Sequence, residues 1–117
     1  MVPISVNSSK ILIGDGLIDN IRLAITDLTC PCNVLIVSDS NVSKFYVGKV
    51  KSQLDKLNFE VYIYVLSPGE QYKSLNTIEK IYAILSQNFM SRCDAIVAIG
   101  GGIVTDVAGF AAATYNR

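Results

Sequence analysis

Short apolar runs alternate with amphipathic stretches along most of this chain. Three of the runs have the length and aliphatic content of buried strands, at residues 33–37, 59–66 and 94–99. Hydrophobic residues recur at helical spacing after each run, which predicts helices from about residue 41, over 74–89, and from about Gly102. This alternation predicts an α/β, Rossmann-like fold with a mainly parallel sheet flanked by helices.

The first part of the chain follows another pattern. Residues 2–6 and 10–13 predict two strands joined by a turn at 7–9. After the break at Gly14 to Gly16, apolar residues at helical spacing predict a helix over 17–28.

The predicted helices should each bury one stripe of side chains. In the helix after residue 41, with Ser40 or Asn41 as N-cap, the stripe is Val42, Phe45, Tyr46, Val50, Leu54 and Leu57. In the next helix, with Ser74 as N-cap, it is Leu75, Ile78, Ile81, Tyr82, Leu85 and Phe89.

Polar or glycine-rich clusters follow all three predicted strands of the parallel sheet, at 38–41, 67–70 and 100–102. Because the carboxyl ends of parallel strands meet at one edge, we expect these clusters to lie together. Ligands of such sheets bind at that edge.

Gly100, Gly101 and Gly102 join the last strand to the last helix. Glycines at such a joint let backbone N–H groups approach a phosphate, and the helix start adds partial positive charge. The triplet therefore predicts a diphosphate site. It departs from the dinucleotide fingerprint, since Thr105 stands where the third glycine belongs. The alternative is a tight turn with no ligand.

Acidic side chains near this edge have two interpretations each. Asp106, on the first turn of the last helix, either faces a ligand or complements the helix dipole. Asp39 either accepts hydrogen bonds from ribose hydroxyls or caps a turn. Glu70 and Lys73 either face a ligand from one side of a helix start or form a solvated ion pair.

Composition narrows the class of protein. The 117 residues suit one domain, and half of them are hydrophobic. Ten basic and ten acidic side chains cancel without a basic stripe, which argues against nucleic-acid binding. No apolar run is long enough for a membrane span and no signal peptide is evident, so we expect a cytoplasmic protein.

The three cysteines predict no disulfide framework. Cys30 and Cys32 are too close for an ordinary structural bridge. They could ligate a soft metal, but the chain has no histidine and no second cysteine pair, which favours a plain loop before a strand. Cys93 is expected to be a small buried residue.

Four segments, taken together, resemble the N-terminal, NAD-binding part of 3-dehydroquinate synthase. They are Ile13–Leu17, Ser38–Val42, Pro68–Leu75 and Gly100–Arg117, of which the last two are the specific ones. The resemblance covers essentially the whole chain. The family carries glycine where Thr105 stands.

The resemblance implies roles for individual residues. Asp39 and Asn41 would lie at the adenosine ribose, and Glu70 and Lys73 would contact the ribose and phosphate region of NAD. Gly101, Gly102 and Ile103 would place backbone N–H groups on the pyrophosphate, and Asp106 would lie near the nicotinamide. Arg117 would reach the substrate phosphate, which suits a planar guanidinium.

The resemblance also implies a reaction. The family converts 3-deoxy-arabino-heptulosonate 7-phosphate to 3-dehydroquinate and phosphate, with transient oxidation by NAD and a divalent metal, zinc or cobalt. This is a step of the shikimate pathway toward chorismate and the aromatic amino acids. The family tends to form homodimers.

The family's metal ligands, a glutamate and two histidines, lie in later sequence. We therefore expect residues 1–117 to form the NAD-binding domain without the helical C-terminal domain, and to be inactive alone. Two alternatives stay open. One is another sugar-phosphate cyclase or a metal-dependent glycerol or alcohol dehydrogenase; the other is a non-catalytic nucleotide-binding domain.

Overall fold

The computed structural model describes residues 2–6, 9–23, 33–66, 75–91 and 94–115. Its centre is a parallel three-stranded sheet made of β3 (Asn33–Asp39), β4 (Glu60–Leu66) and β5 (Ala95–Ile99). The strand order is β4-β3-β5, so β3 lies in the middle. The α/β, Rossmann-like fold predicted from the alternating pattern is confirmed, and the strand bounds agree within two residues.

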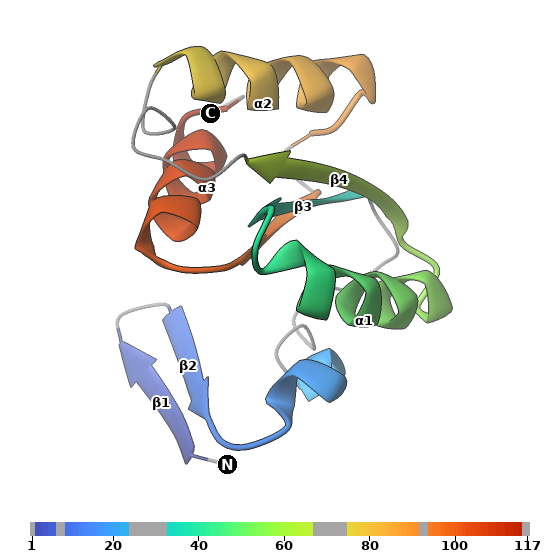
Figure 1. Cartoon of the computed structure of the whole chain (residues 1–117), viewed down its shortest axis with the longest axis vertical. Coiled ribbons are helices and arrows are strands. Elements are labelled where there is room, and N and C mark those ends of the chain that lie inside the picture. The colour runs from blue at the N-terminus through green and yellow to red at the C-terminus, as the bar shows by residue number, and fades with distance from the viewer. Residues whose placement is uncertain (1, 7–8, 24–32, 67–74, 92–93, 116–117) are drawn as a thin grey trace.

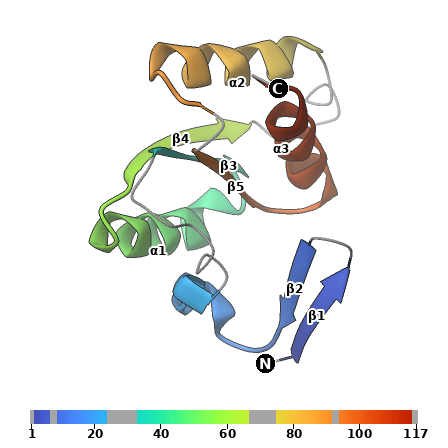
Figure 2. The same ribbon diagram turned by 180° about the vertical axis from the view of Figure 1, so that it is seen from behind.

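Three α-helices cover the two faces of the sheet (Figure 1). They are α1 (Ser43–Lys56), α2 (Leu75–Gln87) and α3 (Gly102–Thr114). In the view from behind, α1 again lies on one side of the sheet and α2 and α3 on the other (Figure 2). No described helix is long and apolar enough to cross a membrane.

Alternate residues of β3 build two separate cores, because successive strand side chains point to opposite faces. Val34 and Ile36 belong to the cluster that includes Val50 of α1. Leu35 and Val37 belong to the cluster that includes residues of α2 and α3. All four side chains are fully buried, which explains why this strand reads as an unbroken apolar run.

The N-terminal strands form a hairpin of their own. β1 (Val2–Val6) and β2 (Ser9–Ile13) pair antiparallel as a separate two-stranded sheet. Both predicted strands are confirmed, while the turn between them lies at positions outside the described residues.

The prediction of a helix over 17–28 is wrong for residues 17–23, the part of this range that the structure describes. Two short 3₁₀ helices stand there, η1 (Leu17–Asp19) and η2 (Ile21–Leu23). Asn20 between them has φ −145° and ψ 59°, which breaks helical continuity. Residues 24–28 lie outside the described part of the chain.

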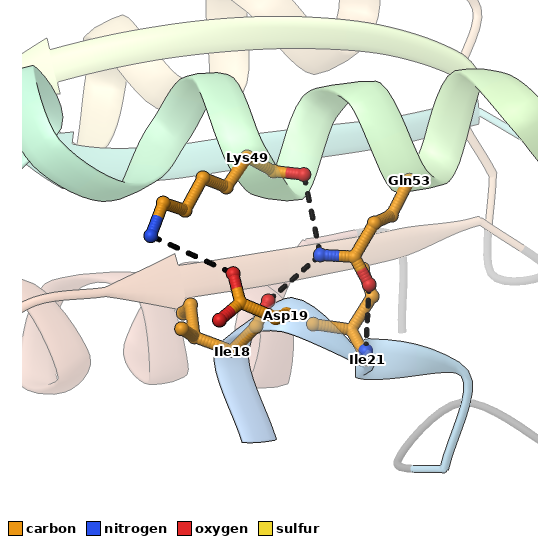
Figure 3. A network of polar contacts seen from close by, with 5 residues as sticks. All are labelled: Ile18, Asp19, Ile21, Lys49 and Gln53. Atoms are coloured by element: carbon orange, nitrogen blue, oxygen red, sulfur yellow. Dashed lines mark hydrogen bonds and ion pairs between the residues drawn. The ribbon is translucent and has the colours of Figure 1, made fainter. Parts of the chain in front are cut away.

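A glutamine of α1 supports these two turns (Figure 3). Gln53 Oε1 accepts a 2.8 Å hydrogen bond from the Ile21 N–H, and Gln53 Nε2 donates a 2.7 Å bond to the Ile18 carbonyl. Lys49 lies one turn earlier and forms a 3.5 Å ion pair with Asp19. The apolar spacing in this segment therefore reflects packing against α1 rather than an α-helix.

The buried faces of two helices also differ from prediction. In α1 the buried residues are Val47, Val50 and Leu54, whereas Phe45 is 67% and Tyr46 41% exposed. In α2, Leu75 is 75% exposed. Phe89 is 90% exposed because the helix ends at Gln87 and Phe89 adopts φ 55°.

Candidate functional site

The carboxyl ends of the three parallel strands lie at one edge of the sheet. In the register of the sheet Asp39 is opposite Leu66, and Ser38 is opposite Ile99. We call this edge the rim: residues 38–42 after β3, Leu66, and residues 99–103 after β5. Two of the three predicted clusters are thus brought together. The third, at 67–70, lies outside the described residues.

Gly100 is required by the fold itself. Its φ is +154°, a conformation that side-chain-bearing residues rarely adopt. A Cβ atom built there would lie 2.9 Å from Val104 Cγ2, and Val104 is buried in the core. Gly100 alone therefore accounts for a tight strand-to-helix turn.

The next two glycines have no such explanation. A Cβ atom on Gly101 or Gly102 would meet nothing within 4 Å, and neither residue has a φ in the left-handed region. Gly101 has φ −83°, which any residue can adopt. The fold does not need glycine at these two places, so the absence of side chains leaves open space in front of the backbone.

The glycine turn contains the first backbone donors of α3. Gly101 is the N-cap, and no side chain caps the helix. The first intrahelical bond runs from the Thr105 N–H to the Gly101 carbonyl at 3.1 Å. The N–H groups of Gly102 and Ile103 precede that bond, and a helix start leaves such donors without intrahelical partners. They can bind an anion, which the helix dipole also favours.

Thr105, the departure from the family pattern, bonds back into the glycine turn. Its Oγ1 donates to the carbonyl oxygens of Gly101 and Gly102, at 3.2 Å and 3.1 Å. This hydroxyl therefore ties the start of α3 to the glycine turn.

Asp106 is exposed and is the fifth residue of α3. Its predicted place on the first helical turn is wrong, because the helix begins at Gly102 and its first turn contains no acidic residue. The macrodipole effect is confined to the first turn, so dipole complementation explains this carboxylate less well.

Asp39 supports the turn between β3 and α1. Its Oδ1 accepts hydrogen bonds from the N–H groups of Asn41 at 2.9 Å and Val42 at 2.8 Å. The prediction of Ser40 or Asn41 as the N-cap of α1 is wrong. The N-cap is Val42, which makes no side-chain capping bond, and the Asp39 carboxylate holds the turn that precedes the helix. Both bonds end on Oδ1, and within the described part of the chain none reaches Oδ2.

One polar contact at the rim was not predicted from the sequence. Ser38 is fully buried, and its Oγ donates a 2.8 Å hydrogen bond to the Ile99 carbonyl. A serine at the end of an otherwise apolar run was the available signal. Its place at the start of the polar cluster 38–41 hides this signal.

Several predicted positions lie outside the described residues, namely Glu70, Lys73, Arg117, Cys30, Cys32 and Cys93. Their roles remain predictions. Among the residues that are described, no group of three cysteine, aspartate or glutamate side chains could hold a metal ion.

A small cavity of about 90 Å³ opens at the other end of the sheet. It is lined by Ala95 and Ile96 at the amino end of β5 and by residues that include Met90, Asp94 and Tyr115. The Asp94 carboxylate is occupied there, since it accepts bonds from the N–H groups of Asn33 and Ser91 at 2.9 Å and 2.7 Å. This cavity is not part of the rim.

Sequence comparisons connect the chain with one family. Residues 63–117 match the sequence model of the family described as 3-dehydroquinate synthase N-terminal. A 3-dehydroquinate synthase of Streptococcus sanguinis is 41% identical over 107 residues, which are 92% of this chain and 30% of that protein. One from Clostridium acetobutylicum is 37% identical over 111 residues, which are 95% of this chain and 31% of that protein. The chain thus spans less than a third of the length of either relative.

A structural comparison gives a consistent result. The crystal structure of 2-deoxy-scyllo-inosose synthase complexed with carbaglucose-6-phosphate, NAD⁺ and Co²⁺ matches with a TM-score of 0.75 at 30% identity. The match covers 86% of this chain and 27% of that one. The resemblance noted from the sequence motifs is confirmed: this chain is a homologue of the N-terminal part of the 3-dehydroquinate synthases.

Proposed function

We propose that the rim binds the diphosphate and the adjoining ribose of NAD, and that the chain forms the cofactor-binding domain, residues 1–117, of a 3-dehydroquinate synthase. The observation that carries the proposal is the pair Gly101 and Gly102. A Cβ atom at either position would enter space that the chain leaves empty. Glycine is expected there if a ligand must approach the backbone closely.

The backbone and one carboxylate supply the proposed contacts. The N–H groups of Gly101, Gly102 and Ile103 would donate to the pyrophosphate, with the positive end of the α3 dipole behind them. Asp39 Oδ2 would accept hydrogen bonds from the adenosine ribose while Oδ1 keeps the turn. Asn41 would lie beside that ribose, because it follows in the same turn.

Four further positions complete the proposed site. Glu70 and Lys73 would contact the ribose and phosphate region, Asp106 would lie near the nicotinamide, and Arg117 would bind the substrate phosphate. These roles rest on the motif resemblance.

The proposed activity of the whole protein is the conversion of 3-deoxy-arabino-heptulosonate 7-phosphate to 3-dehydroquinate and phosphate by a cytoplasmic homodimer. NAD supplies reversible hydride transfer in such an enzyme, and the residues described here hold and orient it. The metal of the family does not fit the residues in hand. The chain has no histidine, and the described residues contain no suitable cluster.

Calorimetric titration of the purified 117-residue chain with NAD tests the proposal. We expect binding by the unsubstituted chain and a loss of about tenfold or more in affinity for Gly102→Ala, because the new methyl group would occupy the diphosphate space. Gly109→Ala is the matched control: it lies in the same helix, and its Cβ also meets nothing within 4 Å. Both variants should keep or gain stability, since alanine favours a helix over glycine.

Two results would contradict the proposal. One is equal NAD affinity of Gly102→Ala and Gly109→Ala. The other is binding of a different nucleotide with no binding of NAD, which would favour a non-catalytic nucleotide-binding domain.

A further inference from the structure

One buried hydroxyl links the two strands whose ends carry the proposed NAD contacts. The 2.8 Å bond from Ser38 Oγ ends on the carbonyl oxygen of Ile99, the last residue of β5. The next residue, Gly100, turns away from the sheet with φ +154°. The bond therefore holds the peptide group that joins Ile99 to Gly100, at the point where the chain leaves the sheet.

The residues beside Ser38 bind the other parts of the rim. The Ser40 N–H donates a 2.9 Å bond to the Leu66 carbonyl at the end of β4. Asp39, between the two serines, holds the turn before α1 through Oδ1. Residues 38–40 thus connect the ends of all three strands, and they place the proposed ribose carboxylate relative to the glycine turn.

We propose that Ser38 is a positioning residue for NAD, an inference that rests on the proposed function. Ser38 is fully buried and would not touch the cofactor. It would act through the Ile99 carbonyl, by fixing the direction in which the glycine turn leaves β5. Glycine backbones are permissive, so Gly100 and Gly101 depend on such a bond to present the N–H donors in one orientation.

Without the hydroxyl, the Ile99 carbonyl would lose its bond to Ser38 Oγ at a buried place. The peptide group would then rotate toward another donor or toward water, because an unsatisfied buried carbonyl is costly. The diphosphate donors would be spread over several orientations, and binding would have to select one of them. We therefore expect the loss of the hydroxyl to weaken NAD binding even though the fold is kept.

Three substitutions test this role in the 117-residue chain, with NAD titrated by calorimetry below the unfolding temperature of each variant. Ser38→Ala removes the donor and should weaken NAD binding about tenfold. Ser38→Cys nearly conserves the side-chain volume and keeps a weak donor, so its NAD affinity should lie between those of the unsubstituted chain and Ser38→Ala. Val34→Ala, at the opposite end of the same strand and equally buried, should lower stability and leave NAD affinity unchanged.

The outcomes separate the two proposals. If the unsubstituted chain binds NAD and Ser38→Ala binds it equally well, the positioning role is overturned and the proposed function stands. If affinity falls to the same extent in Val34→Ala, the effect is general destabilisation and the role is likewise overturned. If Ser38→Ala does not fold, the NAD affinities of Ser38→Cys and Val34→Ala are compared instead. Weaker binding by Ser38→Cys alone supports the positioning role, and equal affinities overturn it. Failure of the unsubstituted chain to bind NAD overturns both proposals.

Discussion

Gly100 and Val104 lie so close that a Cβ atom on Gly100 would be 2.9 Å from Val104 Cγ2 and 3.1 Å from Val104 Cβ. The contact joins the strand-to-helix turn to the core, because Val104 is buried against the α2 and α3 side of the sheet. It separates the three glycines into one that the fold requires and two that it does not.

Gly100→Ala should therefore destabilise the chain. The alanine would combine an unfavourable φ with the Val104 contact, and each costs on the order of 1–3 kcal/mol. Urea denaturation followed by circular dichroism measures the change. Gly48→Ala in α1 is the control, since its Cβ meets nothing within 4 Å, and it should add about 0.5–1 kcal/mol of stability. Equal stability of the two variants would be incompatible with the strained turn.

Asp39→Asn should separate the structural role of Asp39 from its proposed ligand role. An asparagine Oδ1 can still accept from the Asn41 and Val42 N–H groups, so stability should change by less than about 0.5 kcal/mol. Its amide nitrogen would present donors where a ribose hydroxyl needs an acceptor, so NAD affinity should fall about tenfold.

Asp39→Ala is the companion variant. It loses both turn bonds and should also cost about 1–2 kcal/mol of stability. Stability comes from thermal unfolding and affinity from calorimetry. Undiminished NAD binding by Asp39→Asn would remove Asp39 from the site.

Gln53→Glu should loosen the 3₁₀ segment from α1. The carboxylate keeps the acceptor for the Ile21 N–H but loses the donor to the Ile18 carbonyl, which should cost about 1–3 kcal/mol at neutral pH. Below about pH 4 a protonated glutamate regains a donor, and part of the loss should be recovered. Ser52→Glu, an exposed neighbour on α1, controls for the added charge. A pH-independent difference between the two variants would contradict the assignment.

The contribution of Tyr64 to stability should be lost at strongly alkaline pH. Burial raises the pKa of its phenol above the ordinary value of 10.0, so the folded state binds the phenolic proton more tightly than the unfolded state. The contribution is complete below pH 10.0 and is lost as pH rises through the folded-state pKa. As pH rises through the folded-state pKa of Tyr64, Tyr64→Phe should therefore lose less stability than the unsubstituted chain. Unfolding midpoints of Tyr64→Phe and the unsubstituted chain, measured from below pH 10.0 upward, test this prediction.

The sheet could be predicted because its central strand, β3, is buried on both faces. Val34 to Val37 form an uninterrupted apolar run, and such runs between amphipathic helices have few other interpretations. The rim followed from topology alone, since parallel strands end on the same side.

What could not be predicted depended on partners distant in sequence. Gln53 holds residues 18–21 in place from more than thirty positions away in the sequence. The local sequence of residues 18–21 gives no indication of these hydrogen bonds. Phe45 and Tyr46 fit a helical stripe by spacing, yet α1 turns Val47 toward the sheet. Spacing identifies an apolar face only to within a residue or two.

The distinction among the three glycines was also beyond sequence reasoning. Their side-chain-free backbones look alike in the sequence, and only the position of Val104 assigns the strain to Gly100. The motif resemblance supplied the proposed site residues directly, but it gave no physical reason for each.

The order of the strands has a consequence for how the chain folds. β3, α1 and β4 are contiguous in sequence and can pair early, whereas β5 must close a separation of 61 residues before Ser38 meets Ile99. Closure over a long loop is entropically costly, so we expect this contact to be the late step. The proposed NAD site at the rim would then be completed only at the end of folding.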